Sequence, residues 1–91
     1  MNDLNKLREQ INIIDKEMLD LFEKRMNFSK SIAKYKKENN LPIFNKKREN
    51  EVINNNKKLL ENKEYSIYYE KFIKSLMDIS KEYQEKTMEE E

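Results

Sequence analysis

Residues 4–35 read LNKLREQINIIDKEMLDLFEKRMNFSKSIAKY, and this stretch decides the fold. Its apolar side chains recur at steps of three and four, interrupted once by Arg25, at Leu4, Leu7, Ile11, Ile14, Met18, Leu21, Phe28, Ile32 and Tyr35. This spacing is typical of a helix with a heptad seam that packs against a partner helix. Asn2 or Asp3 can cap its start, and Asn39-Asn40-Leu41-Pro42 ends it because proline disfavours helical backbone in the preceding residue. The pattern predicts a helix of about 35 residues, roughly 50 Å long at 1.5 Å per residue.

Two further helices follow. Asn45 is a good N-cap residue, and a short helix is expected from there to about Leu60, weakened by the three asparagines at 54–56. A third helix is expected to start after Ser66 and to run past Tyr83, with one apolar side formed by Tyr69, Phe72, Ile73, Leu76 and Met77. The sequence shows no internal repeat, so residues 1–91 are predicted to form a single domain.

The composition favours an all-α fold that needs a partner. The 91 residues include no glycine and one proline, so the chain lacks the residues that hairpins and tight turns require. Only 36% of the residues are hydrophobic and 41% are charged, which leaves little for a solitary monomer to bury. A long helix cannot be covered by so small a chain, and we expect it to pair with the same helix of a second copy in an intertwined homodimer.

Charge and residue usage exclude several classes of function. The net charge is +1 with the two signs interspersed, which argues against a nucleic-acid or membrane surface. The chain has no cysteine and no histidine, so it lacks the thiolate nucleophile, the usual general base and the commonest metal ligand. We expect no metal and no cofactor. Because there is no long apolar run and no signal-peptide pattern, a soluble cytoplasmic protein is expected.

Three arginines stand among sixteen lysines, at positions 8, 25 and 48. A guanidinium grips a carboxylate through two parallel hydrogen bonds and remains charged when desolvated, which a lysine does less well. For any one of these arginines, a surface ion pair is an alternative explanation. Their positions relative to the apolar pattern favour a binding role.

Arg25 occupies a seam position, where a buried charge must meet an anion or reach water. Ser29, Ile32 and Lys36 continue its face of the helix, and Lys36 lies about 16 Å away along the axis. The two cations could flank a small dianion, although a solvated stripe at the end of a bundle would show the same pattern. Arg8 lies about 25 Å from Arg25 along the same helix. Antiparallel pairing of two long helices would bring Arg8 of one chain toward Arg25 of the other and so predicts a site shared between subunits.

Polar residues of the other two helices complete the candidate site. Arg48 and Glu49 lie in the first turn after Asn45, where the helix dipole explains the glutamate but not the arginine. Ser80 and Gln84 are four residues apart and interrupt the apolar side of the third helix, which suits hydrogen bonding to an ether or hydroxyl. A helix end that turns polar as it leaves the core is an alternative. Such a site has no nucleophile with a partnered base, but it could bind a dicarboxylate and stabilise charge separation within it.

These residues resemble a known family. The ordered set Leu7-Arg8-Glu9-Gln10-Ile11, Asp15, Glu23-Lys24-Arg25, Lys34-Tyr35-Lys36, Pro42, Asn45-x-x-Arg48-Glu49 and Ser80-x-x-x-Gln84 is similar to that of the all-α chorismate mutases. The single motifs are weak, whereas their order and spacing are specific. The resemblance implies an intertwined homodimer of three-helix chains that rearranges chorismate to prephenate without a cofactor, in phenylalanine and tyrosine biosynthesis.

The resemblance also implies a role for each residue. Arg8 of the partner chain and Arg25 would bind the two carboxylates of chorismate, while Lys36 and Gln84 would contact its ether oxygen. Further substrate contacts would come from Arg48 and Ser80 at carboxylates, and from Glu49 and the backbone near Asn45 at the ring hydroxyl. The family usually has Asp at position 45. Asn caps a helix equally well, but a contact that needs the Asp charge would be lost.

Two alternatives remain open at this point. Isochorismate-pyruvate lyase uses the same scaffold and a similar cationic pocket, and the combination of Arg48, Ser80 and Gln84 favours the mutase over it. The second alternative is a non-catalytic dimeric helical module that regulates another enzyme. That alternative predicts that Arg25→Ala is tolerated, because the substitution removes a charge from an apolar seam.

Overall fold

A computed structural model describes residues 3–90 of the chain, and all of its regular structure is helical. Helix α1 spans Asp3–Glu38, α2 spans Lys46–Leu59, a 3₁₀ turn η1 spans Lys63–Tyr65, and α3 spans Ser66–Glu90. The order of one long, one short and one medium helix confirms the prediction from the sequence. Asp3 is the first helical residue of α1, and Asn2, the other predicted cap, lies outside the described residues.

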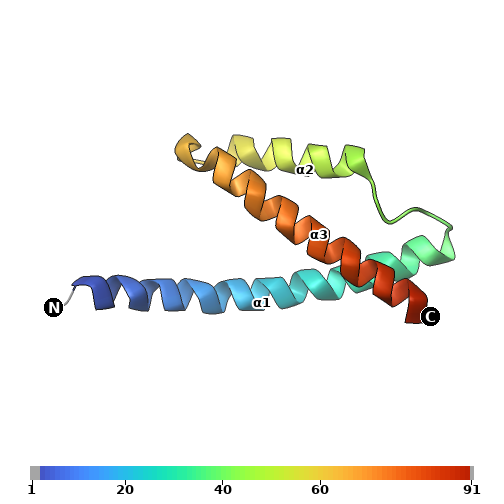
Figure 1. Cartoon of the computed structure of the whole chain (residues 1–91), viewed down its shortest axis with the longest axis horizontal. Coiled ribbons are helices and arrows are strands. Elements are labelled where there is room, and N and C mark those ends of the chain that lie inside the picture. Colours follow the sequence, from blue (N-terminus) through green and yellow to red (C-terminus); the bar gives the residue numbers. More distant parts are fainter. Residues whose placement is uncertain (1–2, 91) are drawn as a thin grey trace.

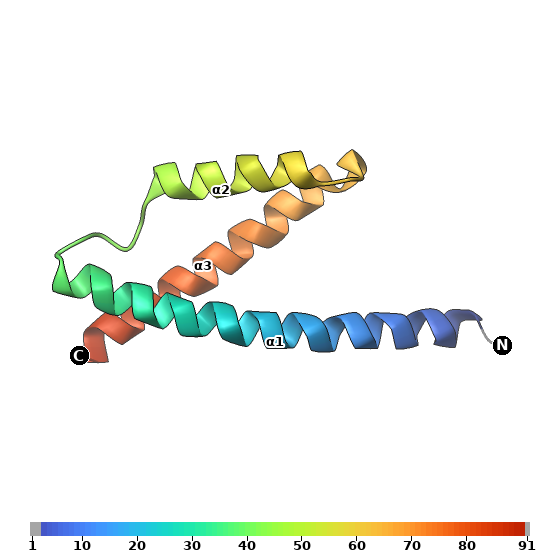
Figure 2. The ribbon, with the colours of Figure 1, turned by 180° about the vertical axis from the view of Figure 1, so that it is seen from behind.

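The three helices form an elongated, open arrangement with extents of 56 × 27 × 15 Å. Helices α2 and α3 run in opposite directions and pack against each other. The C-terminal half of α3 crosses the C-terminal half of α1 (Figures 1 and 2). The N-terminal half of α1 extends away from both other helices (Figure 1). The chain therefore has three helices packed together at one end. The N-terminal half of α1, called the projecting arm below, extends from them.

The ends of the helices follow from local chemistry. Asn40 adopts a left-handed backbone with φ of 54°, and Leu41 N–H and Asn40 N–H donate to the carbonyls of Lys36 and Lys37. These two hydrogen bonds form a Schellman cap. Helix α1 therefore ends at Glu38, upstream of Pro42. At the start of α2 the Asn45 side chain accepts a hydrogen bond from Arg48 N–H at 3.0 Å, which confirms the predicted N-cap.

The core lies mainly between α2 and α3. Ile53, Ile73 and Met77 are buried there, with Val52, Tyr69 and Leu76 packed around them. The asparagines at 54–56 do not interrupt α2, and Asn56 donates to the Tyr69 hydroxyl of α3 at 2.9 Å. Where α1 meets α3, the small side chains of Ala33 and Ser29 are buried, and small residues at a crossing let two helices approach closely.

The heptad seam of α1 is uncovered within this chain. Leu7 and Ile11 in the projecting arm are 65% and 55% exposed, and Phe28, farther along the seam, is 70% exposed. An apolar groove of about 730 Å³ also opens between the arm and α3, lined among others by Met18, Phe22, Phe72, Leu76 and Ile79. Large contiguous apolar surfaces mark interaction sites in soluble proteins. The predicted pairing with a second copy would cover this surface and stays a prediction.

Candidate active site

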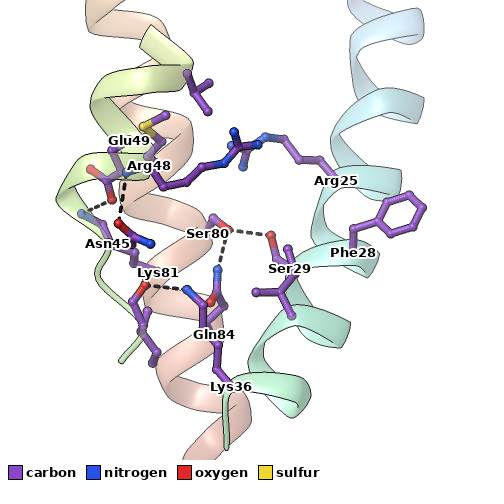
Figure 3. Close-up of a pocket in the computed structure, with 14 residues that line it drawn as sticks. Arg25, Phe28, Ser29, Lys36, Asn45, Arg48, Glu49, Ser80, Lys81 and Gln84 are labelled. Atoms are coloured by element: carbon purple, nitrogen blue, oxygen red, sulfur yellow. Dashed lines mark hydrogen bonds and ion pairs between the residues drawn. The ribbon is translucent and has the colours of Figure 1, made fainter. Parts of the chain in front are cut away.

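A cavity of about 300 Å³ lies where the C-terminal halves of α1 and α3 meet the first turns of α2. Its lining contains all but one of the residues predicted from the sequence, namely Arg25, Lys36, Asn45, Arg48, Glu49, Ser80 and Gln84. Figure 3 shows them converging from the three helices. The structure thus brings together residues that are up to 59 positions apart in the sequence (Arg25 to Gln84, 84 − 25).

Two arginines, Arg25 and Arg48, line the cavity. The side chains of Arg25 on α1 and Arg48 on α2 extend toward each other (Figure 3). Arg25 is half-buried and its guanidinium makes only a long 3.4 Å hydrogen bond to the Leu76 carbonyl. Within residues 3–90 neither guanidinium has a carboxylate at ion-pair distance. Two unpaired cations that face the same space favour the binding of an anion between them.

Lys36 contributes a third cation, from the face of α1 that also presents Arg25 and Ser29. Its ammonium donates to the Ile43 carbonyl at 2.8 Å, which fixes the side chain against the loop between α1 and α2. An ammonium has three N–H donors, so this bond leaves two for a ligand in the cavity. The sequence predicts Arg25 and Lys36 on one face of the helix, and in the structure both line one cavity.

Among residues 3–90, Glu49 is the only carboxylate in the lining, and it is already paired. Lys81 of α3 binds it at 3.0 Å, and both side chains are about one-quarter exposed. The hydrogen bond to Glu49 raises the pKa of Lys81 above its usual value, against the opposing effect of burial. The ammonium also lies 4.6 Å from the centre of the Phe44 ring, within cation–π range. Lys81 therefore neutralises Glu49 and ties the start of α2 to α3.

Ser80 and Gln84 belong to a chain of three buried polar side chains that also includes Ser29. The two serine hydroxyl oxygens are 2.5 Å apart, and the Gln84 amide nitrogen donates to Ser80 Oγ at 3.1 Å (Figure 3). Each of the three side chains is at least nine-tenths buried. Within the described part of the chain, the amide oxygen of Gln84 is buried and has no hydrogen-bond partner. A buried acceptor of this kind is costly unless a ligand or water pairs with it.

Two residues of this site, Lys81 and Ser29, are not among those predicted from the sequence. Lys81 lies four residues after Met77 and three before Gln84, so helical spacing places it on the inner face of α3. Ser29 was placed on the face of Arg25 but was not assigned to the site. Helical spacing places both residues on faces that point inward. It does not identify their partners, because these lie on other helices.

Arg8 is the predicted site residue that the structure does not bring to the cavity. It is exposed in the projecting arm of α1, about 25 Å from Arg25 along the helix axis. Within one chain it cannot reach a ligand held by Arg25. Its predicted role requires a second chain and stays a prediction.

The cavity has a simple chemical character: it has four cations, one carboxylate that is already neutralised, and neutral hydrogen-bonding groups. The chain contains no cysteine or histidine, and the described residues contain no cluster of acidic or histidine side chains suited to a metal ion. No helix in residues 3–90 is long and apolar enough to cross a membrane. Such a cavity can bind a small dianion and stabilise negative charge that develops on it.

Comparison with known proteins gives one match. A family model described as chorismate mutase type II matches residues 7–85. The matched range includes every residue of the cavity lining named above, as well as Arg8. Neither the curated proteins nor the solved structures gave a match.

Proposed function

The chain belongs to the type II chorismate mutase family, and from this premise we propose that it rearranges chorismate to prephenate with the cavity between its three helices as the active site. One observation supports the proposal above all others. Arg25, Lys36 and Arg48 line one cavity. Among the residues of 3–90 that line it, the single carboxylate is neutralised by Lys81 and there is no nucleophile with a partnered base. A unimolecular rearrangement of a dicarboxylate needs cations at fixed positions and no proton transfer.

Binding of chorismate comes first in this mechanism. Chorismate carries two carboxylates, and Arg25 and Arg48 offer unpaired guanidinium groups in the lining of the cavity. We assign one carboxylate to Arg25 with support from Ser80, and place Arg48 as a second cation near the carboxylates. Glu49 accepts a hydrogen bond from the ring hydroxyl, and the backbone near Asn45 helps to orient this hydroxyl. Held in this way, the substrate is restricted to the compact conformer in which its reacting carbons lie close together.

The rearrangement then breaks the bond between the ether oxygen and the ring while a carbon–carbon bond forms. Negative charge develops on the ether oxygen, and a fixed positive donor beside it lowers the barrier. Lys36 is assigned this role, because its ammonium is anchored by the Ile43 carbonyl with two N–H groups to spare. Gln84 is assigned the second contact to the same oxygen through the amide N–H that Ser80 does not use.

The site we propose is completed by a second copy of the chain. The heptad seam and the apolar groove between α1 and α3 are uncovered in one chain, and burying them between two copies supplies the missing core. Antiparallel pairing of the long helices would place Arg8 of the second copy near Arg25, where it binds the other carboxylate. In this proposal a single domain acts as a cofactor-free homodimer in the cytoplasm.

Product analysis tests the proposal. Purified protein is incubated separately with chorismate and with isochorismate, and prephenate and pyruvate are followed by chromatography. The proposal predicts prephenate from chorismate. Pyruvate from isochorismate alone would assign the cavity to a lyase, and a folded protein that forms neither product would leave it a non-catalytic helical module.

A further inference from the structure

The buried serine on α1 has a hydrogen-bonding pattern that its neighbours in the helices do not share. Ser31, Ser75 and Thr87 donate to the backbone carbonyl four residues earlier in their own helices. Ser29 Oγ instead contacts Ser80 Oγ of α3, 51 residues away in the sequence. Ser29 thus links α1 to α3 beside the cavity, which both serines line.

The hydrogen-bond donors and acceptors of the Ser29 and Ser80 hydroxyls can be counted. A serine hydroxyl has one proton to donate and two lone pairs that accept. Ser29 is 4% exposed, and within residues 3–90 Ser80 Oγ is its one hydrogen-bond partner. Either hydroxyl could donate in this pair, and both serines line the cavity. With a substrate carboxylate on Ser80, as proposed above, only donation from Ser29 to Ser80 gives both protons an acceptor, and we therefore take Ser29 as the donor.

Ser80 accepts a second hydrogen bond from the amide nitrogen of Gln84. With both lone pairs used, its own proton has no acceptor within its group of three side chains. Ser80 lines the cavity together with Arg25, so this proton is available to an anion held by the arginine. A hydroxyl whose lone pairs are both occupied also becomes a stronger donor, because hydrogen bonds in a chain polarise one another.

We infer that Ser29 is a positioning residue of the active site, which fixes the Ser80 hydroxyl as a hydrogen-bond donor to the substrate carboxylate bound by Arg25. The inference rests on the proposed function and deepens it. Ser29 also lines the cavity, but in this inference it is assigned no contact with the substrate. It acts through Ser80, and without it Ser80 is free to donate back into the helix or to water that enters the space.

The test uses Ser29→Ala with Ser31→Ala as a matched control. Both substitutions remove a serine hydroxyl from α1 and favour helix, but the Ser31 hydroxyl is exposed and bonds only the Asn27 carbonyl. Chorismate turnover by Ser29→Ala is expected to show kcat/KM lowered roughly tenfold, the scale of one hydrogen bond to a charged group, mainly through a higher KM. Ser31→Ala is expected to match the wild type.

A double substitution separates positioning from simple packing. If Ser29 acts through Ser80, adding Ser29→Ala to Ser80→Ala produces little further loss of kcat/KM. Independent, multiplicative losses in the double variant would overturn the inference, as would unchanged kcat/KM in Ser29→Ala with an unchanged melting temperature. A wild-type protein that does not convert chorismate would instead overturn the proposed function and this inference with it.

Discussion

The ion pair between Lys81 and Glu49 gives the sharpest prediction about stability and substrate binding together. Lys81→Met removes the charge and keeps most of the apolar length of the side chain. The pair is 3.0 Å long with both side chains about one-quarter exposed. Its exposure is intermediate between that of an exposed pair, worth about 0–1 kcal/mol, and that of a fully buried pair, whose disruption costs about 3–5 kcal/mol. Loss of the contact with Phe44 adds about 0.5 kcal/mol.

From these terms we expect Lys81→Met to lower the free energy of unfolding by roughly 1.5–2.5 kcal/mol. For a chain of this size each kcal/mol corresponds to roughly 4–8 °C, so the melting temperature should fall by roughly 6–20 °C. Lys74→Met is the matched control on the same helix, because Lys74 also pairs with a glutamate, Glu70, but its side chain is 59% exposed. Its loss should stay below about 0.5 kcal/mol.

Activity gives a second measurement for the same variant. Without Lys81 the charge of Glu49 is uncompensated beside the proposed dianion, and KM for chorismate should rise about tenfold, the equivalent of about 1.4 kcal/mol. Glu49→Gln added to Lys81→Met removes the repelling charge and should recover part of this loss. Equal losses of stability in Lys81→Met and Lys74→Met, or no recovery of KM in the double variant, would refute this reasoning.

Three further predictions concern assembly, pH dependence and capping. Arg8→Ala and Lys36→Ala proteins, each inactive, should regain chorismate turnover when their subunits are exchanged, and no recovery despite proven exchange would exclude a shared site. The pKa of Glu70 is held below 4.5, chiefly by the hydrogen bond from Lys57, so its contribution to stability is present above pH 4.5 and is lost as the pH falls through the lower folded value. In unfolding experiments across that acid range, Glu70→Gln should therefore weaken the fall in stability, and an unchanged pH dependence would contradict the assignment. Asn45→Ala should cost about 1 kcal/mol in thermal unfolding while Asn45→Asp costs little, because only Ala removes the side-chain oxygen that caps α2; equal losses in the two variants would contradict the capping role.

The sequence predicted those features that depend on local spacing. The length of α1, the Asn45 cap and the shared face of Arg25 and Lys36 follow from helical periodicity and from residue propensities within one or two turns. The Schellman cap at Asn40 was not predicted, because Asn40 and the proline two residues later are both helix stop signals and only the backbone conformation distinguishes them.

The rest of the site depends on how α1 crosses α3. The contact between Ser29 and Ser80 joins residues 51 positions apart, and the pair of Lys81 with Glu49 joins α3 to the start of α2. Helical periodicity places each residue on a face, but the crossing decides which faces meet. The role of Arg8 stays a prediction because it depends on a second chain.

The central claim is that the cationic cavity rearranges chorismate, with Lys36 stabilising the ether oxygen. It is tested most directly by the rate of prephenate formation in the wild type, in Lys36→Ala and in Lys37→Ala. Lys37 is the matched control, since it is the neighbouring lysine of α1 and its exposed ammonium donates to the Met88 carbonyl, outside the cavity lining. Loss of one preorganised donor at a developing charge lowers kcat by about 10²–10³.

The account predicts prephenate formation by the wild type, a loss of at least about a hundredfold in Lys36→Ala with the fold intact by circular dichroism, and near-normal turnover in Lys37→Ala. Turnover in Lys36→Ala that equals the turnover in Lys37→Ala would contradict it.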